Sequence, residues 1–269
     1  MFLCPICKGK LERTATSFKC LSNHCYDIAS SGYVNLLRPG KKNNSVAGDS
    51  KEMIRARTSF FESCHYEKIS NKIASLIPKG AKIIVDAGCG EGYYTENIAK
   101  THTESTVLGF DMSKFGCEHG AKSARRSGTS NVFYAVGSIF ELPLANESVD
   151  CIVNMFAPVA SEEFLRVLKP GGTLIVASAG KEHLNGLKRL LYSDVYDNEE
   201  KFALLYGFLP PLIESLKYET SILGNDVIKN LFTMTPYYHR TSLEDKKKLD
   251  DVCEISTTVE VNFVIYTKE

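Results

Sequence analysis

The sequence has no excess of either charge, because 32 lysine and arginine residues balance 32 aspartate and glutamate residues. A basic coat for nucleic acid is therefore not indicated, although a local patch could still serve an RNA substrate. The chain also lacks an uninterrupted apolar stretch long enough to span a membrane. Its first residues, MFLCPICKGK, lack the basic start and long apolar run of a secretory signal. We therefore expect a cytoplasmic protein with no membrane partner.

In a reducing compartment, the nine cysteines indicate metal binding or buried thiols and not disulfides. Cys4 and Cys7 form a C-x-x-C turn, and a second group follows at Cys20, His24 and Cys25. This spacing predicts a closed, structural zinc site with a short hairpin between its two halves. The fourth ligand is His24 or Cys25. We favour His24, because adjacent residues rarely both fit one tetrahedron.

The segment after this cluster is rich in basic residues. RPGKKNNSVAGDS reads as a loop, and Asp49 or Ser50 could cap a helix that begins near Lys51. Such a patch beside a zinc module suits a phosphate backbone, but a solvated surface explains it equally well. Its six members are Arg38, Lys41, Lys42, Lys51, Arg55 and Arg57.

A glycine-rich turn follows the buried strand KIIVDAG, which contains Asp86. Gly88, Gly90 and Gly92 then precede an amphipathic helix, so a ligand could approach the backbone closely. A dinucleotide-binding turn would need glycine where Tyr93 stands. The pattern D-x-G-x-G-x-G instead resembles class I S-adenosylmethionine-dependent methyltransferases, in which the loop cradles the amino-acid end of the cofactor. A tight turn without a ligand is the alternative for each glycine.

Further residues follow the next strands. STVLGFDMS reads as a strand ending at Asp111, which could accept both ribose hydroxyl protons or cap a helix. GSIFELP resembles the segment beside the adenine, with Ser138 where an acid is usual. Asn154 ends the fourth strand and could touch cofactor or base. Because strands alternate with helices, we expect a parallel sheet covered on both faces, with the ligand at the carboxyl ends of its strands.

The C-terminal part begins with EEFLRVLKPGGTLIVAS, read as a helix, a turn and the fifth strand. His183 follows and lies at the ligand edge or caps a helix. AGKEHLNGLKRLLYSDVY reads as an amphipathic helix, and TTVEVNFVIYTKE as a final strand. Between them, a helix ends in a loop that could stack on an unpaired base, pack in the core or form a lid. The loop contains Tyr237, Tyr238, His239 and Arg240.

The segments CPIC, GYVNLL, GDSKEMIRAR, GCGEGYYT, KPGG and MTPY together resemble the large-subunit (23S) rRNA guanine-N1 methyltransferase family. The resemblance implies a Rossmann-like class I methyltransferase α/β fold with a small N-terminal zinc-binding module. We expect the module over 1–37, a linker and helix over 38–70, and the S-adenosylmethionine-dependent domain over 71–269. The resemblance also implies a homodimer. It implies a zinc ion on Cys4, Cys7, Cys20 and His24, and S-adenosylmethionine contacts at Tyr66, Gly90, Glu91 and His183.

The function implied is methylation of N1 of a guanine in a hairpin loop of 23S rRNA, with the zinc module gripping the RNA. Guanine N1 lies on the Watson–Crick edge, so the target must be unpaired or flipped out. We identify no general base. A small-molecule methyltransferase acting on quinones or metabolites is the alternative, and a binding module without catalysis is another.

Overall fold

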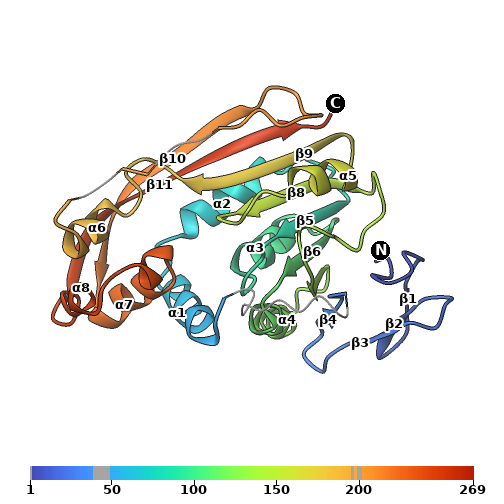
Figure 1. Cartoon of the computed structure of the whole chain (residues 1–269), viewed down its shortest axis with the longest axis horizontal. Helices are drawn as coiled ribbons and strands as arrows, with labels where there is room; N and C mark the ends of the chain where they lie inside the picture. Colours follow the sequence, from blue (N-terminus) through green and yellow to red (C-terminus); the bar gives the residue numbers. More distant parts are fainter. Residues whose placement is uncertain (1, 39–48, 195–196, 199–201) are drawn as a thin grey trace.

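The computed structural model describes residues 2–38, 49–194, 197–198 and 202–269 (Figure 1). A large eight-stranded sheet forms its centre, and a three-stranded sheet lies at the amino-terminal end. Most of the expected loop RPGKKNNSVAGDS, with Lys41 and Lys42, lies outside the described residues. Within the described ranges, no helix has the length and apolar character needed to cross a membrane.

The large sheet has the strand order β10-β11-β9-β8-β5-β6-β7-β4. The pairs from β4 to β9 are parallel, whereas β11 runs antiparallel to both β9 and β10. The chain moves outward from β5 in both directions, which creates a binding crevice at the carboxyl ends of β5, β6 and β8. The expected Rossmann-like fold is confirmed. The strands are β4 Val34–Asn35, β5 Ile83–Ala87, β6 Thr106–Asp111, β7 Val132–Val136, β8 Val149–Met155, β9 Leu168–Ala179, β10 Leu212–Leu223 and β11 Glu254–Thr267.

Neighbouring residues of each central strand point to opposite faces of the sheet, because side chains alternate along a strand. On β5, Ile84 belongs to one buried cluster, with residues of α1 to α4, and Val85 to a second, with residues of α5. Both faces are therefore covered, as expected. The helices are α1 Lys51–Glu62, α2 Glu67–Leu76, α3 Tyr93–Thr101, α4 Lys114–Ser127, α5 Ser161–Val167, α6 Asn185–Leu191, α7 Asn225–Thr233 and α8 Leu243–Lys247, with a 3-10 turn η1 at Pro236–His239.

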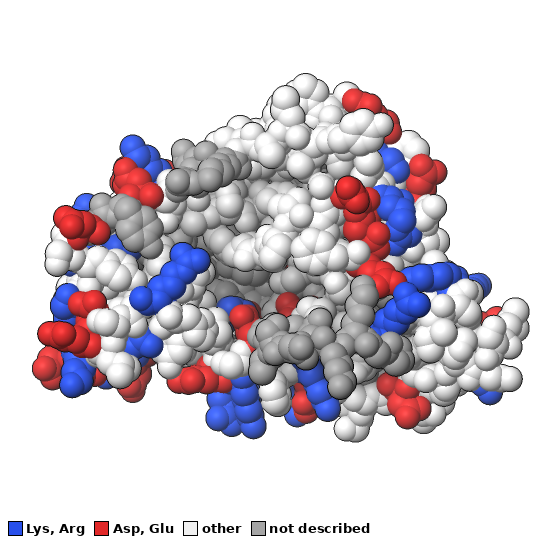
Figure 2. All heavy atoms as spheres, in the orientation of Figure 1, with Lys and Arg blue, Asp and Glu red and all other residues white. Residues whose placement is uncertain are grey.

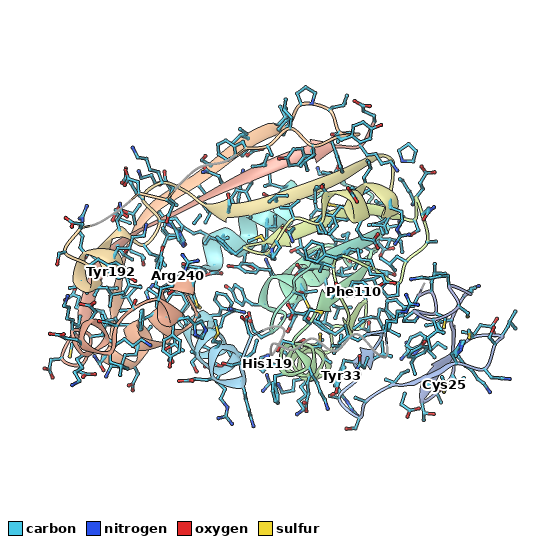
Figure 3. The ribbon with its side chains drawn as sticks, in the orientation of Figure 1. Cys25, Tyr33, Phe110, His119, Tyr192 and Arg240 are labelled. Atoms are coloured by element: carbon cyan, nitrogen blue, oxygen red, sulfur yellow. The ribbon has the colours of Figure 1, made fainter. Side chains whose placement is uncertain are left out.

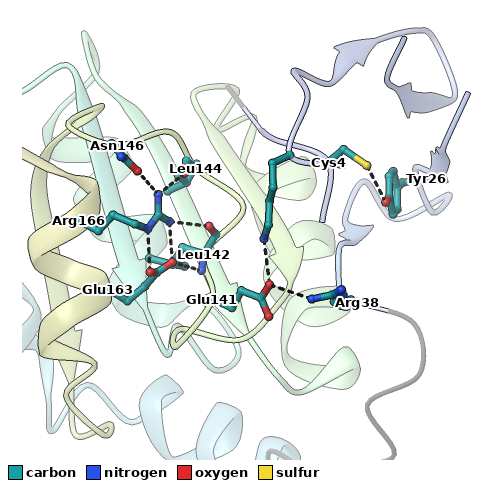
Figure 4. A network of polar contacts seen from close by, with 10 residues as sticks. Cys4, Tyr26, Arg38, Glu141, Leu142, Leu144, Asn146, Glu163 and Arg166 are labelled. Atoms are coloured by element: carbon teal, nitrogen blue, oxygen red, sulfur yellow. Dashed lines mark hydrogen bonds and ion pairs between the residues drawn. The ribbon is translucent and has the colours of Figure 1, made fainter. Parts of the chain in front are cut away.

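The amino-terminal segment packs directly on the second face of the sheet. Its strands are β1 Glu12–Arg13, β2 Ser17–Lys19 and β3 Cys25–Asp27, so the expected hairpin is confirmed. Phe2 is fully buried, with its ring 5.9 Å from that of Phe110, and β4 pairs with β7. Lys8 and Arg38 both form ion pairs with Glu141 (Figure 4). Removing this segment would thus expose part of the main core.

Local differences from the sequence expectations have physical causes. The helix expected from residue 179 onward begins only at Asn185, because Leu184 adopts a left-handed conformation with φ of 58°. The expected Lys-Pro-Gly-Gly turn is a bulge inside β9, where the pairing with β8 shifts register. Strand β10 was not predicted. The expected cap at Ser50 is confirmed, since its hydroxyl accepts the Met53 N–H.

Candidate functional site

The predicted zinc ligands form a compact cluster. The four ligand atoms of Cys4, Cys7, Cys20 and His24 lie within 4.8 Å of one another. His24 Nδ1 is 3.5 Å from the sulfur of Cys4 and 3.4 Å from that of Cys20. A tetrahedral zinc ion would separate sulfur from nitrogen by about 3.5 Å and two sulfurs by about 3.8 Å. The donor set therefore fits zinc.

The surroundings of the cluster decide between the two candidates for its fourth ligand. Cys25 is exposed on β3 and does not belong to the group, so the preference for His24 is confirmed. Tyr26 Oη lies 3.2 Å from Cys4 Sγ, where it can donate a hydrogen bond to a thiolate (Figure 4). Four protein ligands leave no open position, so the site is structural.

The glycine turn after β5 has room for a ligand because side chains are missing from it. A Cβ at Gly88 would lie 2.7 Å from Ala157 Cβ, and one at Gly92 would lie 2.5 Å from Tyr134 Oη. Both residues have φ near +90° (91° and 90°), which favours glycine. The turn is therefore held against β8 and β7, with its backbone facing the crevice.

A cavity of about 1000 Å³ lies at the carboxyl ends of the central strands. That volume is at the upper end of the range for small-molecule sites. Figure 2 shows a hollow near the middle of the face, with acidic and basic side chains intermingled around it. Seven residues expected to bind the cofactor line the cavity: Tyr66, Gly88, Gly90, Glu91, Asp111, Ser138 and His183.

Asp111 ends β6 beside the glycine turn. Its two carboxylate oxygens accept the backbone N–H groups of Gly90, at 2.9 Å, and Ser113, at 2.7 Å. Each oxygen keeps a further lone pair for a ribose hydroxyl. Burial raises the pKa of Asp111, while the two N–H donors oppose that shift. Asp111 thus fixes the turn and faces the cavity.

Asp86 and Asn154 lie beneath the turn and do not line the cavity. Thr95 donates to Asp86 at 2.6 Å, and burial raises the pKa of the Asp86 carboxyl to about 7. Asn154 donates to the carbonyl oxygens of Ala87, at 2.8 Å, and Pro158, at 3.3 Å. Both side chains therefore support the loops that line the cavity. Direct cofactor contact by either residue stays a prediction.

Tyr66 and His183 meet at the other side of the cavity. The Glu260 backbone N–H donates to His183 Nδ1 at 3.2 Å, so the ring proton of neutral His183 lies on Nε2. Tyr66 Oη lies 3.2 Å from Nε2 and accepts that proton. Burial and the nearby charge of Lys188 lower the pKa of His183 to about 4, which keeps the ring neutral. Tyr66 can then donate its own hydroxyl proton into the cavity.

An ion-pair network was missed by the sequence reading. Arg57 Nη1 lies 2.5 Å from Asp49 Oδ2 and 3.3 Å from Glu91 Oε2, and all three side chains line the cavity. Arg57 also lies 3.1 Å from the position that a Gly90 Cβ would take. Burial raises the pKa of Glu91 against the opposing charge of Arg57. Arg57 is therefore part of the cavity wall and is not a free member of the basic patch.

The expected aromatic and basic loop divides into two parts. Tyr237 and Arg240 line the cavity, whereas Tyr238 and His239 do not. Tyr238 Oη donates to Glu52 at 3.1 Å, which ties η1 to α1. Figure 3 shows Arg240 on the side of the molecule opposite Cys25. Only two of these four side chains are therefore placed to meet a ligand.

A family model described as a methyltransferase domain matches residues 78–235, which is more than half of the chain. The chain belongs to the methyltransferase-domain family. A second model, described as the N-terminal part of RlmA and named as a zinc ribbon, matches residues 2–45. The crystal structure of the YcgJ protein from Bacillus subtilis superimposes with a TM-score of 0.52 at 17% identity, covering 76% of this chain and 99% of that one, which shows the fold alone.

Two relatives of this methyltransferase extend the comparison. A 23S rRNA (guanine(748)-N(1))-methyltransferase from Streptomyces fradiae is 29% identical over 97% of this chain and 95% of its own. A putative 23S rRNA (guanine-N(1)-)-methyltransferase from Micromonospora griseorubida is 32% identical over 67% of this chain and 66% of its own. The protein is an S-adenosylmethionine-dependent methyltransferase homologous to these enzymes.

The cavity of this methyltransferase fits a sulfonium nucleoside. The described lining side chains that carry a charge in their usual ionisation states are three carboxylates and two guanidinium groups, which leaves one negative charge to complement the sulfonium. They are Asp49, Glu91, Asp111, Arg57 and Arg240.

Proposed function

We propose that the protein transfers the methyl group of S-adenosylmethionine to N1 of a guanine in a hairpin loop of 23S rRNA. The observation that carries this proposal is the near end-to-end match, over 97% of the chain, to an enzyme named for that reaction. The zinc cluster and its family match support it further, because a small-molecule acceptor would need neither. The protein would act on 23S rRNA in the cytoplasm.

The residues of the crevice would hold the cofactor as follows. The bound cofactor supplies an electrophilic methyl group on its sulfonium. The glycine turn would receive its amino-acid end, Asp111 its ribose and Ser138 the edge of its adenine. Tyr66 would donate a hydrogen bond toward it, held in place by His183. These contacts would position the methyl group, and positioning carries much of the rate enhancement for such a transfer.

The acceptor must reach this point with its Watson–Crick edge free. Guanine N1 is paired inside a helix, so the base must come from a loop or be flipped out. The cavity volume lies at the upper end of the range for small-molecule sites, which supports entry of a base beside the cofactor. We assign no general base for the N1 proton.

The zinc module would grip the folded RNA. Lys10 and Lys19 project from it and are exposed, whereas Lys8 is paired with Glu141. Deletion of 1–37 would be a poor test, since Phe2 is part of the main core. The double variant Lys10→Glu/Lys19→Glu should weaken RNA binding and reduce its salt dependence, with zinc content unchanged. Unchanged RNA affinity would contradict this role.

The protein would act as a homodimer. Strand β10 is a sheet edge, and its first two residues and the segment before it expose large apolar side chains, an arrangement that favours contact with another chain. These are Leu204, Tyr206, Leu209, Leu212 and Ile213. Sedimentation equilibrium tests the proposal, and a monomer at micromolar concentration would contradict it.

Purified protein, labelled S-adenosylmethionine and 23S rRNA fragments provide the direct test of the reaction. Digestion of the RNA to nucleosides should yield labelled 1-methylguanosine. Quinones and small metabolites offered in parallel should take up no label. Transfer to a small molecule and not to RNA would overturn the proposal in favour of a small-molecule methyltransferase.

A further inference from the structure

An exposed phenyl ring stands where β8 ends. Phe156 follows Met155, the last residue of the strand, and is 44% exposed although its ring is large and apolar. Its φ is +51°, in the left-handed region that residues other than glycine, asparagine and aspartate rarely adopt. Both the exposure and the backbone conformation cost free energy, and such features persist at binding sites.

The surrounding structure forces this conformation on Phe156. Its own N–H donates to the Ala177 carbonyl at 2.9 Å, which fixes it to β9. Asn154 donates to the carbonyls of Ala87 and Pro158, so the chain on both sides of Phe156 is anchored. The Phe156 ring lies beside the His183 ring, with centroids 6.0 Å apart and an interplanar angle of 30°. The ring is therefore held in one place and still open to the cavity.

Phe156 lies one residue before a contact with the glycine turn that is proposed to hold the cofactor. The next residue, Ala157, is so close to the glycine turn that a Cβ at Gly88 would lie 2.7 Å from it. Phe156, Ala157 and Pro158 all line the cavity, and so does Ser138. In the strand order, the first three follow β8 and Ser138 follows β7, with β5 and β6 between these two strands. An acceptor that approaches a cofactor held by this turn would therefore come close to the end of β8.

We propose that Phe156 is the platform on which the acceptor purine base stacks during methyl transfer, an inference that rests on the proposed function. A rigid, flat ring with an open surface is the feature that unpaired bases use on proteins, and it holds a base without reading its identity. Stacking would keep the guanine plane fixed while N1 meets the methyl group. Nearby hydrogen-bond donors and acceptors would then select guanine.

Three variants of Phe156 distinguish the effect of its aromatic ring from the effect of its unusual backbone conformation. Phe156→Asn keeps a residue that tolerates positive φ, Phe156→Leu keeps apolar bulk, and Phe156→Tyr keeps an aromatic ring. The matched control is Phe115→Leu, because Phe115 is 47% exposed on α4 and does not line the cavity. The measurements are kcat/KM for 23S rRNA methylation, S-adenosylmethionine affinity by calorimetry, and the thermal midpoint.

We expect the Asn and Leu variants at Phe156 to lose roughly 10- to 100-fold in kcat/KM for RNA, with Tyr within about threefold of wild type. S-adenosylmethionine affinity should change less than kcat/KM for RNA methylation. The thermal midpoint of the Asn variant should not fall. Activity of the Asn and Leu variants equal to wild type would overturn the platform while the proposed function stands. So would an equal loss in the Phe115 control. A wild-type protein that methylates no RNA would end the proposed function, and the platform with it.

Discussion

Tyr66 and His183 stand 117 positions apart in the chain, yet their side chains meet with 3.2 Å between Tyr66 Oη and His183 Nε2. The pair joins the start of α2 to the segment after β9, in the lining of the cavity. Because His183 Nδ1 accepts from the Glu260 backbone, the direction of the hydrogen bond is fixed. The Tyr66 proton is left to point toward a ligand, and burial raises the pKa of Tyr66, which keeps it protonated.

Replacing Tyr66 by phenylalanine should weaken S-adenosylmethionine binding by about five- to tenfold, the usual effect of losing one hydrogen bond. The ring and its packing on Phe60 would remain, so the thermal midpoint should change little. Calorimetry measures the affinity. Tyr93→Phe is a matched control, because Tyr93 does not line the cavity and the variant keeps the ring that stacks on Phe61, so it should bind the cofactor normally. Equal affinity for the Tyr66 variant and wild type would contradict the assigned direction.

Stability should depend on pH through His183. The pKa of His183 is about 4 in the folded chain, against 6.5 for an ordinary histidine. Below pH 6.5 the His183 imidazole therefore binds a proton in the unfolded chain but stays neutral in the folded one. The free energy of unfolding is therefore unaffected by His183 above about pH 6.5, and it decreases as the pH falls from there toward 4. In His183→Gln, urea unfolding should depend on pH less steeply, by up to about 1.4 kcal/mol per pH unit. Asp86 and the other carboxyls titrate in both proteins, and parallel pH profiles would argue against a buried neutral His183.

Asp111→Asn should reduce cofactor affinity by roughly 10- to 100-fold, since charge-assisted hydrogen bonds contribute about 1.5–3 kcal/mol. The amide would keep one acceptor oxygen but turn an NH₂ group toward a backbone N–H that Asp111 now satisfies. Equilibrium dialysis measures the affinity, and circular dichroism checks the fold. Asp150→Asn is a useful comparison, because Asp150 accepts two backbone N–H groups at the start of β5, away from the cavity lining. An Asp111 variant with wild-type affinity would rule out ribose binding there.

Cys4→Ser should lose bound zinc and destabilise the amino-terminal segment, whereas Cys25→Ser should retain one zinc per chain. Cys4 is buried and belongs to the cluster with His24, whereas Cys25 is exposed and lies outside it. Metal content by mass spectrometry, followed by proteolysis of the segment, gives the comparison. Because Phe2 packs on Phe110, the loss of zinc should also lower the thermal midpoint of the main domain. Zinc loss in Cys25→Ser would reverse the assignment of the fourth ligand.

The sequence was informative where chemistry is local. The zinc site and the turn from Asp86 to Gly92 each depend on residues close together in the chain, so spacing predicted them, although it left His24 and Cys25 as alternatives for the fourth zinc ligand. Arg57 gave no such signal, because its role depends on α1 folding back over the glycine turn. Tyr66 came from family resemblance alone. Strand β10 was missed because its first four residues are all exposed, so the alternation of buried and exposed positions begins only at Leu216.

The most direct measurement is mass mapping of 23S rRNA from cells with and without this protein. We expect one guanine in a hairpin loop to carry an additional 14 Da, about the mass of one methylene, only when the protein is present, with fragmentation placing the methyl group on the Watson–Crick edge at N1. Identical rRNA maps from the two strains, or a methyl group on a different atom or base, would contradict the account.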